Sequence, residues 1–212
     1  LVLAVVTPST GRREASRPAA GRWRALANGR LARVSGTAFT MQFASTGLML
    51  LAALVASDRF GLSPAGRGLV VAAFGVAGLL SGTASGHLAD RLGLLRVGGS
   101  ALVLLAASTG FATDARWLWL LVLLTGLAGA AATAVRVLTQ TLGVRSTPSN
   151  PSGAMSVTLA VQFLGTAVAP VLLPIYDASA LLAGLAAGGV ALLGAVIITS
   201  GRDGAVRCSH GH

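Results

Sequence analysis

Lysine is absent from this sequence of 212 residues, cysteine occurs once, and acidic residues number only six. All sixteen basic residues are therefore arginine, a bias typical of GC-rich coding DNA such as that of many bacteria. The single cysteine, Cys208, excludes a disulfide framework. With His210 and His212 it offers at most three metal ligands on a short tail without rigid support, so we expect no metal site.

Six long apolar stretches dominate what remains, since 54% of the residues are hydrophobic and only 10% are charged. Each stretch is close to the roughly 20 residues that a helix needs to cross about 30 Å of hydrocarbon. Lipid offers the backbone no hydrogen-bond partner, and the runs show no alternation with period two, so helices are favoured over barrel strands. The predicted fold is all-α and polytopic, with spans at 34–56, 68–89, 97–113, 117–135, 155–174 and 178–200.

The arginines indicate which ends of the spans face the cytoplasm. Seven precede the first span, and if that side is inside, only Arg59, Arg67 and Arg116 fall outside. Cytoplasmic loops are enriched in basic residues, so we expect a multi-pass protein of the cytoplasmic membrane with both ends of the chain inside. Trp117 and Tyr176 at outer span ends fit an aromatic belt. A nucleic-acid partner would require a soluble basic surface with polar or aromatic readers, and we expect none.

No acidic residue lies within any predicted span, so this chain offers no buried carboxylate to carry a proton. Arg136 is the one charge that breaks into an apolar stretch, near the inner end of the fourth span. We favour snorkelling of its long side chain to the headgroups over binding of a substrate anion. The sequence also lacks a Walker loop, a His-Glu metal helix, a Gly-x-Ser-x-Gly elbow and a dinucleotide fingerprint, so we expect neither an enzyme nor a cofactor.

The loop between the second and third spans has the most specific pattern, GHLADRLG over residues 86–93. A tight turn between helices needs a residue that tolerates positive φ, and Gly93 supplies it. The pattern resembles the signature cytoplasmic loop of the major facilitator superfamily, although Leu94 and Leu95 replace the basic pair that usually follows. By resemblance the loop is a conformational latch, formed here by Gly86, Asp90, Arg91, Gly93 and Arg96.

The resemblance implies a fold as well as a loop. Transporters of this superfamily have two six-helix halves, each made of two inverted three-helix repeats. The chain resembles the carboxyl-terminal half, truncated at its amino end, with an amino-terminal six-helix half as its missing partner. We expect the end of a preceding helix and a basic connector over 1–33, the six-helix bundle over 34–201 and a cytoplasmic tail over 202–212. Residues 23–34 predict either an amphipathic juxtamembrane helix or the leading end of the first span.

By the same resemblance the first, second, fourth and fifth spans face a central cavity, and the third and sixth face lipid. Polar side chains are costly against lipid, so a helix turns them towards protein, water or substrate. Interhelical hydrogen bonding without a ligand is the alternative role for each of them. Gly165, Pro170 and Pro174 predict hinge points in the fifth span. The candidate substrate cavity comprises Gln42, Ser45, Thr46, Phe74, Gln162 and Thr166, with Met41, Phe43 and Phe163 as further apolar walls.

These features favour part of a secondary active transporter. It would move a small solute, of the drug or sugar efflux type, across the cytoplasmic membrane by alternating access. Its partners would be the solute, the lipid bilayer and the missing half. The alternative is a membrane interaction protein that does not transport, or a remnant half that assembles with another chain.

Overall fold

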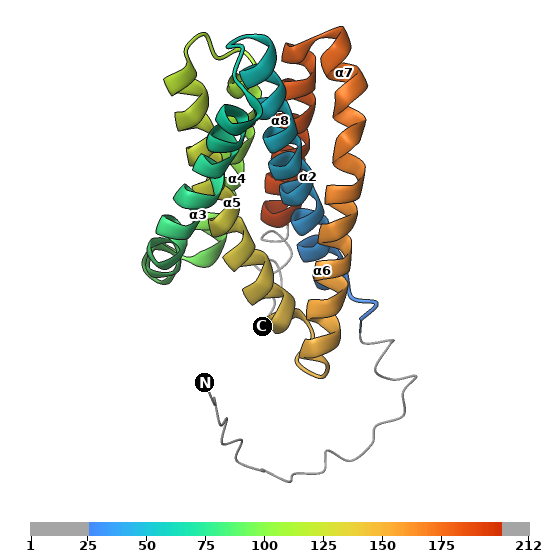
Figure 1. Cartoon of the computed structure of the whole chain (residues 1–212). Helices are drawn as coiled ribbons and strands as arrows, with labels where there is room; N and C mark the ends of the chain where they lie inside the picture. Colours follow the sequence, from blue (N-terminus) through green and yellow to red (C-terminus); the bar gives the residue numbers. More distant parts are fainter. Residues whose placement is uncertain (1–25, 201–212) are drawn as a thin grey trace, which may run out of the picture.

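The computed structural model describes residues 26–200, and all the regular structure within that range is helical. Six stretches are long and apolar enough to cross a membrane, which confirms the predicted all-α, polytopic architecture. Figure 1 shows them standing side by side as one bundle. The elements are α2 (Gly29–Asp58), α3 (Pro64–Leu92), α4 (Leu94–Ala112), α5 (Leu118–Ser146), α6 (Pro151–Val168), η1 (Ala169–Val171), α7 (Leu172–Ala178) and α8 (Ala180–Thr199).

The main helix contacts repeat when the first three spans are exchanged with the last three. Helix α2 packs on α6 and α8, and its counterpart α5 packs on α3 and α4. The pairs α2 with α5 and α4 with α8 are also in contact, and each maps onto itself. Figure 1 shows α2 and α5 running in opposite directions. This is the pattern that two inverted three-helix repeats produce.

Helices α2 and α5 are the central pair of the bundle, and the other spans pack against them. In Figure 1, α3 and α6 flank the viewed face, α2 and α5 cross between them, and α4 and α8 lie behind. Helix α2 is the most enclosed, because 61% of the residues in its apolar 18-residue stretch are buried, whereas in α3 only 17% are. Helix α3 therefore leaves a face uncovered, on which the side chain of Leu79 is 82% exposed.

Two glycines allow the closest approaches between helices. A Cβ atom on Gly129 of α5 would overlap the backbone of Phe74 in α3. A Cβ atom on Gly165 of α6 would lie 2.6 Å from the carbonyl oxygen of Phe39 in α2. In lipid, where packing rather than hydrophobic exclusion drives helix association, small residues let backbones meet in this way. These contacts fix how α3 and α6 sit against the central pair.

The fifth span is interrupted near its carboxyl-terminal end. Helix α6 gives way at Val168 to one turn of 3₁₀-helix, and α7 then continues to Ala178. Pro170 lies in that turn, where it cannot donate a backbone hydrogen bond and its ring would clash with the preceding helical turn. The predicted break at Pro170 is confirmed, whereas Gly165 lies within regular α6 and Pro174 within regular α7.

Polar side chains join neighbouring helices at both ends of the bundle. Asn28 caps α2 by accepting from the backbone of Arg30, and its Nδ2 donates to the carbonyl oxygen of Ser146 at the end of α5, 2.9 Å away. At the other end, the hydroxyl of Tyr176 donates to Asp58, 3.1 Å away. Each bond spans more than 100 residues of sequence and ties two different spans together.

Within residues 26–34, the start of α2 favours the leading end of the first span over a separate juxtamembrane helix. The helix begins at Gly29, after the non-helical Leu26 and Ala27, so residues 29–34 are the leading end of the first span. Trp23, the predicted connector before residue 26 and the tail over 202–212 with Cys208 lie outside the described residues.

Candidate functional site

Three polar side chains from three different spans meet part-way along the length of the bundle. The Oε1 atom of Gln42 in α2 accepts a hydrogen bond from Nε2 of Gln162 in α6, at 3.0 Å. The same oxygen accepts from Nη2 of Arg136 in α5, at 3.4 Å. Gln162 is buried, with 7% of its surface exposed, whereas Arg136 is exposed. We call Gln42, Gln162 and Arg136 the polar cluster.

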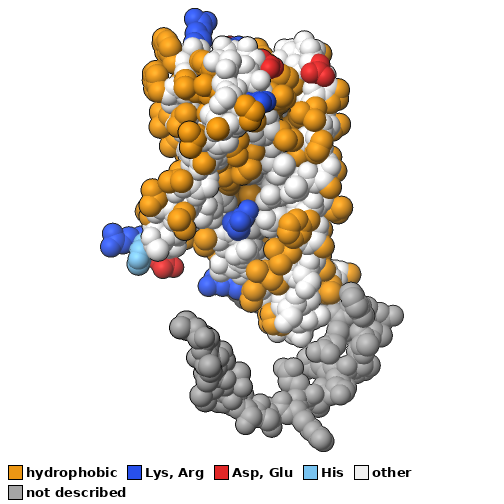
Figure 2. Space-filling view, viewed as in Figure 1, with side chains coloured by type: hydrophobic (Ala, Val, Ile, Leu, Met, Phe, Trp, Pro, Cys, Tyr) orange, Lys and Arg blue, Asp and Glu red, His pale blue; other side chains and the backbone are white. Residues whose placement is uncertain are grey.

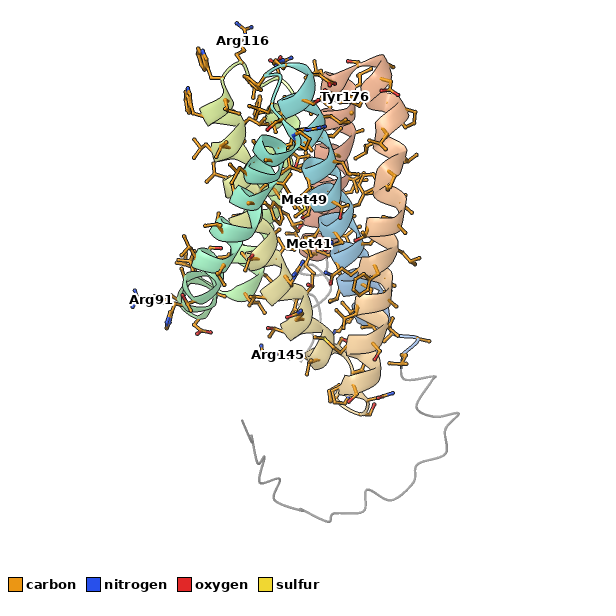
Figure 3. The ribbon with its side chains drawn as sticks, viewed as in Figure 1. Met41, Met49, Arg91, Arg116, Arg145 and Tyr176 are labelled. Carbon is orange, nitrogen blue, oxygen red and sulfur yellow. The ribbon has the colours of Figure 1, made fainter. Side chains whose placement is uncertain are left out.

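The polar cluster lies well inside the helices that carry it. Gln42 is near the middle of α2, and its neighbour Met41 is labelled in Figure 3, away from Tyr176 at one end and Arg145 at the other. Gln162 lies in the interior of α6. Helix α5 continues ten residues beyond Arg136, to Ser146, so this arginine lies further from the helix end than the predicted span boundary suggests.

The remaining polar residues predicted to line the cavity have different surroundings. Thr46 lies beside the polar cluster, because Nε2 of Gln42 donates to its hydroxyl at 3.4 Å. Ser45 is buried, and its hydroxyl donates to the carbonyl oxygen of Met41 in its own helix. Thr166 follows Gln162 by one helical turn, and its buried Oγ1 has no hydrogen-bond partner among the described residues.

The predicted apolar walls divide into buried and exposed residues. Met41 is fully buried in the core and Phe43 is buried against the carboxyl-terminal part of the fifth span and α8, so neither faces open space. Phe74 is half-buried where α3 meets α5. Phe163 in α6 is 68% exposed. Of the four predicted apolar walls, only Phe74 and Phe163 therefore have exposed side-chain surface.

At the predicted latch, the connection between α3 and α4 is a single residue long. Helix α3 ends at Leu92, α4 begins at Leu94, and Gly93 between them has φ of 91°, which confirms the expected positive value. The side chains of Asp90, Arg91 and Arg96 are exposed, and Figure 3 shows Arg91 pointing away from the bundle. Within residues 26–200 none of them forms an ion pair.

The comparison with known families decides the class of this protein. The family model described as Major Facilitator Superfamily matches residues 34–204, a range that covers all of the six spans except the first turn of α2. The chain belongs to the major facilitator superfamily. No curated protein matches its sequence. The chain is therefore a multi-pass membrane protein from a superfamily of transporters, and its six spans form a half of the major facilitator fold.

The acidic residues of the described spans lie close to the helix ends, so the polar cluster is the main polar feature of the interior of the described bundle. Sequence reasoning found Gln42 and Gln162 as costly amides, but assigned Arg136 to the headgroups. The structure instead directs Arg136 across to α2. The signal available in the sequence was that Arg136 stands alone in an apolar stretch without a carboxylate to neutralise it.

Proposed function

We propose that the chain is the carboxyl-terminal six-helix half of a secondary active transporter. It moves a small solute of the drug or sugar type out across the cytoplasmic membrane, by rocking against a second half. The observation that carries this proposal is the polar cluster, in which Gln42, Gln162 and Arg136 from three spans meet away from the ends of the helices. Transporters of this kind bind substrate near the midplane of the membrane, where their repeats meet. The lining proposed for this site is Gln42, Ser45, Thr46, Phe74, Gln162 and Thr166.

The uncovered faces of α3 and α6 support the need for a second half. Leu79 and Leu80 of α3 and Phe163 of α6 are largely exposed. On α3, a Cβ atom at Gly82 or Gly86 would have no neighbour within 4 Å. A glycine stripe suits close contact with another helix in lipid, yet nothing in the described chain occupies it. An amino-terminal half of the same fold is the proposed occupant.

The arrangement of arginines supports an orientation with both ends of the chain in the cytoplasm. Figure 3 shows Arg91 and Arg145 at one end of the bundle and Arg116 at the other. The end with Arg91 and Arg145 is the more basic one in the sequence, and basic residues are retained on the cytoplasmic side. Labelling of a cysteine at position 145 from outside intact cells would overturn this orientation.

Efflux measured with and without the second half tests the proposed function. The reading frame upstream of Leu1 is expected to encode six further spans with a second copy of the latch loop. Bacterial cells that express both halves should accumulate several-fold less of a radiolabelled drug or sugar, with neutral and acidic compounds of both kinds tested, than cells that express only this chain. The chain alone should transport neither solute, because one half cannot enclose a site between two bundles.

Two outcomes would contradict the proposal, and they differ in meaning. Transport by the isolated chain would remove the need for a second half. An assembly of both halves that moves no drug and no sugar, although both halves are inserted in the membrane, would favour the alternative of a membrane interaction protein that does not transport. The same exposed faces of α3 and α6 would then serve only to hold a partner.

We further propose that the loop containing Gly86, Asp90, Arg91, Gly93 and Arg96 is a conformational latch. Asp90 is exposed at the end of α3, so its carboxylate is free to accept hydrogen bonds from the second half. Replacement of Asp90 by asparagine in the two-half assembly should slow efflux by roughly tenfold, about the value of one charge-assisted hydrogen bond. The amount of protein in the membrane should not change.

The matched control for this latch is His87→Asn, since His87 is an exposed residue one turn before Asp90 on the same helix. Efflux rate and membrane content are measured for both variants. A D90N transporter with wild-type efflux, or one that fails to insert, would remove the latch role.

A further inference from the structure

Arg136 carries a positive charge that no carboxylate within residues 26–200 neutralises. It lies inside α5, and the one ion pair within those residues joins Arg59 to Asp114 at the outer end of the bundle. A charged side chain inside a membrane span is costly and marks a functional site or a substrate path unless it is paired. Figure 2 shows a small group of basic atoms part-way along the viewed face, surrounded by hydrophobic and uncharged surface. The charge of Arg136 is therefore available to something outside the described chain.

The direction of the side chain argues against a simple role as a membrane anchor. A snorkelling arginine in the inner part of a span extends towards the headgroups. Arg136 instead reaches across to Gln42, near the middle of α2. Gln42 is itself held by Gln162, whose amide is buried and donates to the same oxygen. Gln42, which Gln162 orients, thus holds one nitrogen of the guanidinium group from the side.

Most of the hydrogen-bonding capacity of this guanidinium group is unused. The group has five N–H donors in a rigid planar fork. One nitrogen, Nη2, bonds to Gln42, and no other partner of the Arg136 side chain occurs in the described part of the chain. A planar fork of donors matches the two oxygens of a carboxylate, or those of a phosphate, better than it matches any neutral group.

We propose that the solute of this transporter is a small organic anion, and that Arg136 binds its acidic group while Gln42 and Gln162 hold the guanidinium in position. The inference rests on the proposed function and makes it more specific, because a drug or sugar substrate would then be an acidic one. The acidic residues of the described spans are confined to the helix ends, which fits this assignment, since no carboxylate beside Arg136 would repel an anion.

Binding to the purified assembly of both halves tests the inference without depending on transport. The probes are benzoate, phenyl phosphate and gluconate, each at constant ionic strength, with benzamide and glucose as neutral counterparts. The unfolding temperature of the detergent-solubilised protein is measured against probe concentration. At least one anion should stabilise the wild type, its neutral counterpart should not, and R136Q should bind that anion about 10- to 100-fold more weakly.

Two further variants separate the site from general charge. R136K keeps the charge but loses the fork, so its affinity should fall between those of wild type and R136Q. R145Q removes the other arginine of α5, near the end of that helix, and should bind as the wild type does. An R136Q protein that unfolds at the wild-type temperature without probe shows that the fold is intact; if it does not, the comparison of R136K with wild type is used.

Three results would overturn the inference: none of the anions stabilises the wild type, the neutral counterparts stabilise it equally, or R136Q and R136K both bind as the wild type does. The failure of the proposed function gives a different signature, since binding of an anion would persist while cells with both halves export no drug and no sugar. Efflux of neutral solutes that R136Q leaves unchanged would preserve the transporter and remove the anion site.

Discussion

Replacement of Gln42 by leucine is expected to lower efflux by the two-half assembly by about tenfold or more, while the protein still inserts. Its Oε1 atom accepts from both Gln162 and Arg136, so leucine removes the acceptor that joins three spans. Loss of a hydrogen bond that positions a charged group costs about one order of magnitude in binding. The guanidinium group would then lose its support in α2, and the buried amide of Gln162 would lose its partner.

Stability should change less than transport in this variant. Interhelical hydrogen bonds between membrane spans contribute roughly 0.6 kcal/mol each, so loss of both bonds should cost about 1 kcal/mol. The measurements are the initial rate of efflux and the unfolding temperature in detergent. Gln140→Leu is the matched control, because Gln140 is half-buried on α5 and makes no side-chain hydrogen bond within the described residues. Equal efflux from Q42L and Q140L would contradict a role for the polar cluster.

Replacement of Gly129 by alanine is expected to be the most destabilising small change in the bundle. The added Cβ atom would overlap the carbonyl oxygen and Cα atom of Phe74, which belong to the backbone of α3 and cannot rotate away. Overpacking of this kind costs about 1–3 kcal/mol. We expect the unfolding temperature in detergent to fall by on the order of 5–10 °C, or the yield of folded protein to drop sharply.

Gly126 provides the control for this substitution, one turn earlier on the same helix. A Cβ atom at Gly126 would lie 3.6 Å from Cβ of Ala77 in α3, which is ordinary contact. G126A should therefore unfold within a few degrees of the wild type. If G129A proved as stable as G126A, the close approach of α3 to α5 would be wrong.

The spans could be predicted from the sequence because hydropathy and length suffice for that purpose, but the helix ends could not. The predicted fourth span stops at residue 135 because Arg136 interrupts the apolar run. The helix continues to Ser146, since backbone hydrogen bonding does not depend on whether side chains face lipid or water. The break at Pro170 was predictable because proline has a local effect on any helix.

The candidate site was only partly predictable. Gln42 and Gln162 are recognisable as costly amides in apolar helices, but their meeting depends on how α2 and α6 are rotated, and the approach at Gly165 sets this. Met41 and Phe43 were proposed as cavity walls, yet both lie in the core. In a span that is apolar on all sides, the sequence contains little information about which face is buried.

The hydrogen bonds at the two ends of the bundle have a mechanical consequence. Asn28 ties the amino-terminal end of the first span to the carboxyl-terminal end of the fourth, and Tyr176 ties the carboxyl-terminal end of the fifth span to that of the first. Hydrogen bonds at both ends of a helix bundle oppose the sliding of its helices past one another. We therefore expect the force generated by solute capture to tilt these six helices as one lever, with deformation confined to the proline break in the fifth.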